Sequence, residues 1–320
     1  MDRRTFLQAS ATAAALTLLP RPLIAWQQSA VDQLGENYRK TPLNVTPVRE
    51  RAKLFMVSGI GGNIAVLANS GEALLIDAGS HLRTDELLAK VKELGCPKVG
   101  TLINSHWHFD HTDGNRNLAH AGASIIAQEN TKKRLSSDTK MEIFGITFPA
   151  APPDALPATT FGEASTVEHG NERLHLTWVP NAHTDSDAYV HFEHADVIHT
   201  GDLVFNGFYP LIDYSTNGWI GGQAAGAQKV ADLAKSSTKI IPGHGPLADK
   251  QTVQNFSDML KRVHERLDTF MNQGKSVADV VAAKPTRDLD EQWGKAMFNG
   301  DKFTQMAYTG LLRHHNKPVA

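Results

Sequence analysis

Three histidines and an aspartate lie within six residues of this 320-residue chain. In chain order they are His106, His108, Asp110 and His111. They follow an apolar run, residues 99–103, that is typical of a buried strand. Neutral imidazole and carboxylate groups are preferred ligands of divalent transition metals. Four such groups at one strand end could serve two metal ions, and two ions close together form a hydrolytic centre.

Four more polar residues follow strand-like apolar runs elsewhere in the chain. They are Asp77, His183, Asp202 and His244. Burying several such groups is costly unless they have partners, so a fold has little reason to gather them without a use. Because the ends of several strands can meet at one edge of a sheet sandwich, this repeated order predicts that the residues converge on the 106–111 cluster.

The elements that would carry these residues form two similar series. In the first, strands are expected at 53–57, 63–68, 73–76, 99–103 and 124–127, with helices at 83–94 and 115–121. In the second, strands are expected at 174–179, 188–192, 197–199 and 239–241, with helices at 221–234 and 252–272. Residues 135–160, which contain four prolines, are expected to form a long irregular loop. Two series of strands followed by helices predict an α/β fold, a four-layer αββα sandwich.

Composition narrows the class of protein. Apolar residues make up 41% of the chain, which is ample for a packed core, and the formal net charge is -2. With 32 basic against 34 acidic residues, there is no basic excess that would indicate a nucleic-acid partner. Cys96 is the only cysteine, so an intrachain disulfide and a metal site of several thiolates are both excluded.

The N-terminus has the features of an export signal. Arg3 and Arg4 precede Thr5-Phe6-Leu7 and an Ala-rich apolar stretch that is short for a membrane span. The paired arginines resemble a twin-arginine signal, so we expect the twin-arginine export machinery as a partner, a periplasmic or otherwise exported location, and no stable membrane insertion after cleavage. The expected organisation is a signal peptide at 1–25, a lead-in at 26–50, a catalytic domain at 51–265 and a helical extension at 266–320.

The histidine and aspartate residues, taken in order over roughly residues 52–265, resemble the metallo-β-lactamase fold superfamily. The matching residues are His106-x-His108-x-Asp110-His111, His183, Asp202 and Gly243-His244-Gly245. The resemblance implies that His106, His108 and His183 bind one metal ion. It implies that Asp110, His111 and His244 bind a second, that Asp202 bridges the two, and that Asp77 orients the histidine loop without binding metal.

The ligand set discriminates within the superfamily. One β-lactamase subclass places a cysteine near the position of Asp202, and this chain cannot, because Cys96 precedes the first motif. The full ligand set is similar to that of hydroxyacylglutathione hydrolases and lactonases. The local sequence around His183 and Asp202 is similar to that of an exported bacterial branch of the superfamily. No clear basic cluster for glutathione is present. The ligands favour two Zn²⁺ ions, with iron or manganese as alternatives.

The resemblance implies a metal-dependent hydrolase in which a bridging hydroxide attacks a carbonyl of a small-molecule substrate, with Asp110 holding the nucleophile and relaying its proton. Thioesters, lactones, lactams and amides all suit this chemistry. A class B-type β-lactamase and a mononuclear-iron sulfur dioxygenase on the same fold are the alternatives. The residues after Asp202 are candidates for the substrate pocket: Phe205, Asn206, Phe208, Tyr209 and Trp219.

Overall fold

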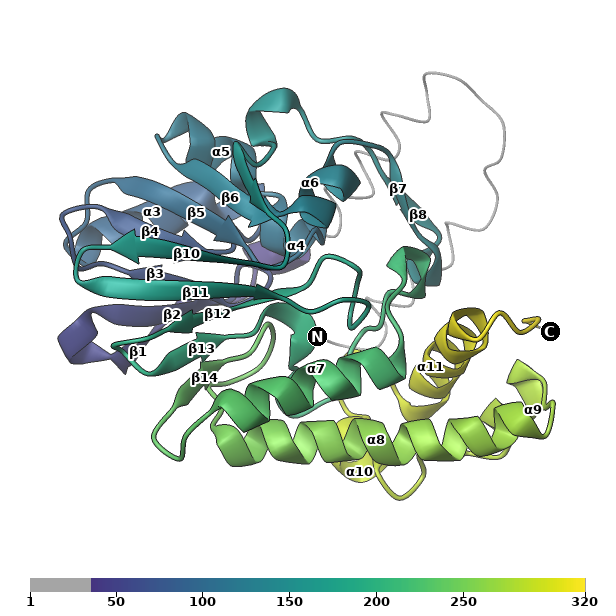
Figure 1. The fold of residues 1–320 in the computed structure, drawn as a ribbon. Helices are drawn as coiled ribbons and strands as arrows, with labels where there is room; N and C mark the ends of the chain where they lie inside the picture. Colours follow the sequence, from purple (N-terminus) through teal and green to yellow (C-terminus); the bar gives the residue numbers. More distant parts are fainter. Residues whose placement is uncertain (1–35, 320) are drawn as a thin grey trace.

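The computed structural model describes residues 36–319. The expected signal peptide at 1–25 and the first part of the expected lead-in lie outside the described residues. Two sheets face each other with helices on their outer sides, so the expected αββα sandwich is confirmed (Figure 1). Among the described helices, none combines the length and hydropathy that a membrane span requires.

The first sheet has seven strands in the order β1-β2-β3-β4-β5-β6-β9. Their bounds are β1 Asn44–Arg49, β2 Leu54–Ser58, β3 Ile64–Leu67, β4 Ala73–Ile76, β5 Val99–Asn104, β6 Ser124–Gln128 and β9 Thr159–Phe161. The strands from β1 to β4 pair antiparallel, and β4, β5, β6 and β9 pair parallel. Every residue of β3 and β4 is buried, as is typical of strands covered on both faces.

The second sheet has five strands in the order β10-β11-β12-β13-β14. Their bounds are β10 Ala164–His169, β11 Glu172–Trp178, β12 Ala188–Phe192, β13 Val197–His199 and β14 Lys239–Ile241. Only β13 and β14 pair parallel. Leu174, Leu176, Val190 and Phe192 point from this sheet into a core shared with residues such as Leu54 of the first sheet. This inner core fixes the two sheets against each other.

Helices cover both outer faces (Figure 1). On the first sheet lie α3 Thr84–Glu93, α4 Phe109–Thr112, α5 Asn115–His120 and α6 Glu129–Leu135. On the second lie α7 Ile220–Leu233 and α8 Lys250–Asn272, followed by α9 Val277–Ala282, α10 Asp290–Trp293 and α11 Gly300–His314. The outer face of the second sheet, α7, α8 and α11 share one hydrophobic core with the loop that follows Asp202.

The structure corrects three expectations about local structure. Residues 44–49, assigned to a polar lead-in, form β1, because pairing with β2 satisfies their backbone. The segment 135–160 contains the hairpin of β7 Thr139–Met141 and β8 Ile146–Phe148 and ends in β9. The strand β10 was missed, since half of its residues are exposed. In addition, α8 runs through residue 265, where the catalytic domain was expected to end.

Candidate metal centre

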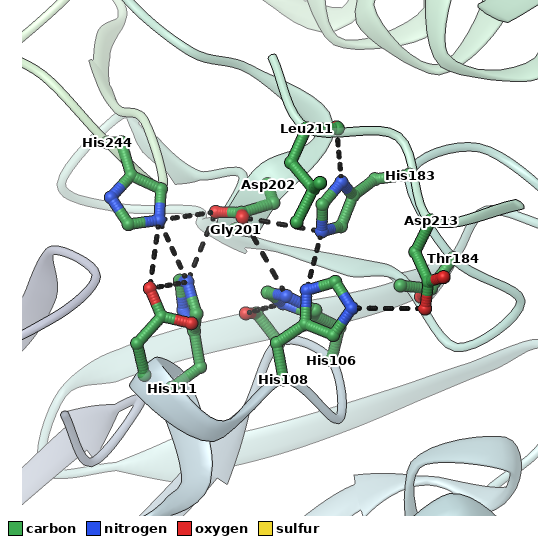
Figure 2. Close-up of polar contacts among 12 residues, drawn as sticks. His106, His108, His111, His183, Thr184, Gly201, Asp202, Leu211, Asp213 and His244 are labelled. Carbon is green, nitrogen blue, oxygen red and sulfur yellow. Dashed lines mark hydrogen bonds and ion pairs between the residues drawn. The ribbon is translucent and has the colours of Figure 1, made fainter. Parts of the chain in front are cut away.

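The polar residues predicted from the sequence converge at one edge of the sandwich. His106 and His108 follow β5, and Asp110 and His111 lie in the short helix α4. The three other ligand candidates follow strands of the second sheet. His183 lies in the loop after β11, Asp202 in a 3-10 helix, Gly201–Leu203, after β13, and His244 in the loop after β14. Figure 2 shows that their side chains point toward one another, with Asp202 between the histidines.

The first cluster, called here the three-histidine group, consists of His106, His108 and His183. All three side chains are buried, and their ligand atoms and one from Asp202 lie within 4.8 Å of one another. His183 Nε2 lies 2.9 Å from His108 Nδ1. Imidazole nitrogens held this close together, with a carboxylate beside them, form a donor set that suits one divalent transition-metal ion.

The second cluster, called here the Asp110 group, consists of Asp110, His111 and His244, whose ligand atoms also lie within 4.8 Å of one another. His244 Nε2 lies 3.3 Å from Asp110 Oδ2 and 3.4 Å from His111 Nε2. Its side chain is 14% exposed, so this group is the more accessible of the two from solvent. The donor set of two imidazoles and a carboxylate suits a second ion.

Asp202 lies between the two groups and presents a different oxygen to each (Figure 2). Its Oδ2 lies 3.4 Å from His183 Nε2, and its Oδ1 lies 3.2 Å from His111 Nε2. Gln223 fixes the backbone here, since its Nε2 donates to the Asp202 carbonyl at 2.9 Å. This is the arrangement expected of a carboxylate that bridges two metal ions.

In the Asp110 group, a carboxylate holds the outward-facing nitrogen of a histidine. Asp77 Oδ2 lies 2.7 Å from His111 Nδ1, so His111 Nε2 faces the centre. The other Asp77 oxygen accepts from Ser105 N at 2.7 Å, which ties down the start of the histidine loop. Asp77 thus lies where a supporting carboxylate is expected, touching the ligand rather than the ion.

In the three-histidine group, the supports come from a loop that sequence reasoning missed. His183 Nδ1 lies 2.8 Å from the Leu211 carbonyl oxygen, and His108 Nε2 lies 3.3 Å from Asp213 Oδ2. Asp213 is itself held by Thr216, whose hydroxyl donates to Oδ2 at 2.6 Å. Asp213 lies 105 residues from His108 and belongs to no motif, so no local signal could have identified it.

The donor atoms fit bound metal ions. Within residues 36–319, His106 Nε2 and Asp202 Oδ1 are buried and have no hydrogen-bond partner, a costly arrangement unless another ligand satisfies them. The backbone at two glycines also lies close to ligand side chains. A Cβ at Gly62 would lie 2.2 Å from His111 Cε1, and one at Gly243 would lie 2.0 Å from Asp202 Oδ1. Only glycine leaves room for these two ligand side chains.

The electrostatics of the two groups differ. Burial lowers the pKa of His183 to about 4 and that of His106 well below its usual value, so these imidazoles are neutral and ready to bind metal. Burial alone would also lower the pKa of His244, but the carboxylates of Asp202 and Asp110 outweigh it and raise the pKa to about 9. The same balance, with Asp202 and Asp77, raises the pKa of His111 well above its usual value.

None of the five expected substrate-pocket residues lines either of the two cavities near the centre. Phe205 and Tyr209 are fully buried in the core, where the Phe205 ring stacks on His244 and the Tyr209 ring stacks on Phe303. Asn206 donates to the Pro246 carbonyl, and Trp219 stacks on His314 at 3.7 Å. Phe208 packs against Phe205. Their position after Asp202 suggested a cavity mouth, but the C-terminal helices cover this side.

Two cavities lie near the centre instead. One, of about 910 Å³, has His244 in its wall, together with Gly61, Asn63 and residues of the N-terminal segment such as Tyr38. The other, of about 430 Å³, lies under the β7–β8 hairpin and is lined by Phe109, Trp107 and Phe148 among others. Only the first cavity includes a member of either ligand group in its wall, so it is the candidate substrate cavity.

Comparison with known proteins agrees with this geometry. The family model of the metallo-beta-lactamase superfamily matches residues 57–247. An atrochrysone carboxyl ACP thioesterase of Aspergillus fumigatus is 24% identical over 251 residues, which are 72% of this chain and 67% of that protein. The chain therefore belongs to the metallo-β-lactamase superfamily, and it is a hydrolase with a histidine and aspartate cluster compatible with metal binding.

Solved structures show the same fold at low sequence identity. A metallo-beta-lactamase from Pontibacter korlensis aligns with a TM-score of 0.57 at 20% identity, covering 69% of this chain and 99% of its own. A metallo beta lactamase from Hirschia baltica aligns with a TM-score of 0.54 at 18% identity, covering 68% of this chain and 98% of its own. These similarities define the fold that positions the centre.

Proposed function

We propose that this protein is an exported, dinuclear zinc hydrolase that cleaves a carbonyl substrate, with a thioester as the first candidate. The observation that carries the proposal is the position of Asp202, which turns one oxygen toward each of two complete ligand groups. When bound there, two ions would supply Lewis-acid activation of water and of a carbonyl group. Imidazole and carboxylate donors without thiolate favour zinc.

The residues of the chain then have distinct roles. Burial alone would raise the pKa of Asp110, but the imidazoles of His111 and His244 outweigh it and lower the pKa. Asp110 is therefore ionised, and its carboxylate can orient the attacking water and accept a proton from it. Asp202 fixes the separation of the two groups, and Asp77 and Asp213 hold the imidazoles that face them. His244, at the cavity wall, lies nearest to an entering substrate.

A thioester is placed first because the relative identified above is a thioesterase, at 24% identity. Lactones, lactams and amides share the carbonyl chemistry and remain in the substrate panel. The solved lactamases resemble this chain in fold at 20% identity or less, which does not carry their substrates over. The complete Asp110 group argues against a mononuclear-iron dioxygenase, because that chemistry generally uses only the three-histidine group.

Export is proposed from the paired arginines Arg3 and Arg4 and the apolar stretch after them. It would place the substrate outside the cytoplasm. A reporter fused to the full chain should be exported, and replacing both arginines with lysine should retain it in the cytoplasm. Export that survives this replacement would favour the general secretory route.

The test of the function is a substrate panel on protein of known metal content. Elemental analysis should give two zinc ions per chain, and a thioester should be hydrolysed faster than nitrocefin, a simple lactone or an amide. Asp110→Asn should abolish the activity while the protein stays folded. One iron per chain without zinc, or turnover unchanged in Asp110→Asn, would reject the dinuclear mechanism. Preferential cleavage of nitrocefin would reassign the protein as a β-lactamase.

A further inference from the structure

The N-terminal segment 36–43 lies against the catalytic sandwich although it precedes the first strand. Arg83, which is only 5% exposed, reaches this segment from the start of α3. Its Nη1 donates to the Tyr38 carbonyl oxygen at 2.8 Å and to the carbonyls of Thr41 and Gly59. One buried guanidinium thus joins the segment to the loop after β2, which makes the segment a fixed part of the fold.

This segment forms one wall of the 910 Å³ cavity, and His244 lies in another part of the wall. Tyr38 lines the cavity, and its ring lies 6.5 Å from that of Phe109, the neighbour of Asp110 in α4. Among residues 36–319 the Tyr38 hydroxyl has no hydrogen-bond partner. A phenol beside the centre is therefore left to bond a ligand.

The lining of the cavity indicates what part of a substrate it holds. Uncharged polar side chains dominate the wall that the N-terminal segment and β1 provide, among them Asn37, Thr41, Asn44 and Thr46. Apart from Tyr38 itself, the only ionisable side chain that lines the cavity within the described chain is His244. Such a wall can bond amides and hydroxyls, but it offers no partner that would offset the desolvation of a carboxylate or phosphate.

Tyr38 is a neutral donor in this setting. Burial raises the pKa of its phenol well above the usual value, and the carboxylates of Asp110 and Asp202 act in the same direction. The hydroxyl therefore keeps its proton across the working pH range and can donate it to a carbonyl oxygen of a ligand.

Resting on the proposed hydrolase function, we propose that segment 36–43 is the substrate-selecting wall of the site. Tyr38 donates a hydrogen bond to an uncharged, amide-bearing chain of the substrate, and Arg83 holds Tyr38 in place. Tyr38 is a substrate-contacting residue, and Arg83 is a positioning residue. The reaction itself stays with the two ligand groups.

The test compares two thioesters with one acyl group, S-butyryl-N-acetylcysteamine and S-butyryl-thioglycolate, which differ in a neutral amide against a carboxylate. The wild-type enzyme should prefer the first by at least about tenfold in kcat/KM. Tyr38→Phe should raise KM for the first about tenfold, the loss of one hydrogen bond, with kcat and zinc content unchanged. Tyr214→Phe, which removes a hydroxyl outside the cavity, should leave both constants unchanged.

A second measurement follows the segment without relying on turnover. Arg39 and Lys40 are exposed, so trypsin cleavage after them reports how firmly the segment is held. Arg83→Met should accelerate this cleavage and raise KM in parallel with Tyr38→Phe. The amide analogue of the first thioester, bound to zinc-loaded protein, should slow cleavage in the wild type and bind about tenfold more weakly to Tyr38→Phe by calorimetry.

The outcomes separate this proposal from the function it rests on. If neither thioester is hydrolysed but binding of the amide analogue depends on Tyr38, the proposed role of segment 36–43 is supported and the proposed thioester hydrolysis is rejected. If thioesters are hydrolysed but neither Tyr38→Phe nor Arg83→Met changes KM or the affinity for the amide analogue, the proposed role of segment 36–43 is rejected. A loss of zinc in Tyr38→Phe would also reject it, because it would show a structural role.

Discussion

The three-histidine group and the Asp110 group lie side by side, share Asp202, and yet differ in charge. In the first, burial lowers the pKa of His106 well below its usual value and that of His183 to about 4, so both imidazoles are neutral. In the second, carboxylates outweigh burial and raise the pKa of His244 to about 9. One half is ready for an ion, while the other holds protons that an ion must displace. The two halves should therefore bind metal with different pH dependence.

The largest effect should come from removing a ligand on either side. His108→Ala should empty the three-histidine group, and Asp110→Ala should empty the Asp110 group. Each should lower kcat/KM by at least about a thousandfold, or about 4 kcal/mol, because two ions act together. Elemental analysis should find one zinc ion in each variant. Two ions retained in either one would show that the groups are not separate sites.

The pH dependence of metal binding tests the electrostatic difference directly. His244 must lose a proton whose pKa is about 9, and the pKa of His111 is also raised, so affinity at the Asp110 group should fall by at least about tenfold per pH unit as the pH drops below 9. The three-histidine group should show no such fall from His183 until the pH approaches 4. Chelator competition should therefore find two ions at pH 8.5 and one near pH 6. Simultaneous loss of both ions would contradict the difference.

The supporting carboxylates should act on one group each. Asp213→Asn should lower the zinc affinity of the three-histidine group about 10–100-fold, since Asp213 faces His108. Asp77→Asn should lower the zinc affinity of the Asp110 group by a similar factor, since Asp77 faces His111. Zinc titration with a chromogenic chelator measures both steps. Each variant is the control for the other, and equal weakening of both steps would show that the supports are shared.

The smallest effect should come from the C-terminal helices. The Tyr209 hydroxyl donates to Asp290 at 3.0 Å and helps to fix the loop that carries Leu211 and Asp213. Tyr209→Phe should lower the free energy of unfolding by about 1 kcal/mol. It should also lower the zinc affinity of the three-histidine group alone, by a few-fold. Tyr308→Phe loses a similar bond elsewhere, to the Lys275 carbonyl, and should change stability without changing zinc affinity. Unfolding titrations with and without zinc distinguish the two.

The sequence predicted the convergence of the ligand candidates because each one lies within a few residues of the end of a strand with a clear apolar pattern. The strands β4, β12, β13 and β14 have the predicted bounds, and β5, which precedes His106, is one residue longer than predicted. Asp202 and His244 lie three residues past β13 and β14. The supports could not be predicted in the same way. Asp213 lies in a loop whose position depends on helices near the end of the chain, and Tyr38 precedes the first strand.

The position of the substrate cavity could not be predicted from the sequence, for a related reason. Aromatic residues after Asp202 suggested a pocket, but pattern alone does not distinguish a cavity wall from a core face. Tyr209 and Phe205 are covered because α10 and α11 pack over this loop. Strand β1 was missed because its burial is partial and it contains Pro47, so its pairing with β2 is evident only in the structure.

The two tight glycines near the centre have a consequence for engineering. A methyl group at Gly62 or Gly243 would collide with His111 or Asp202, so neither position can be diversified without disturbing a ligand. The wall around Tyr38 has no such restriction, because it precedes the strands and joins the sandwich mainly through Arg83. A library aimed at new substrates should therefore vary residues 36–43 and leave both glycines as they are.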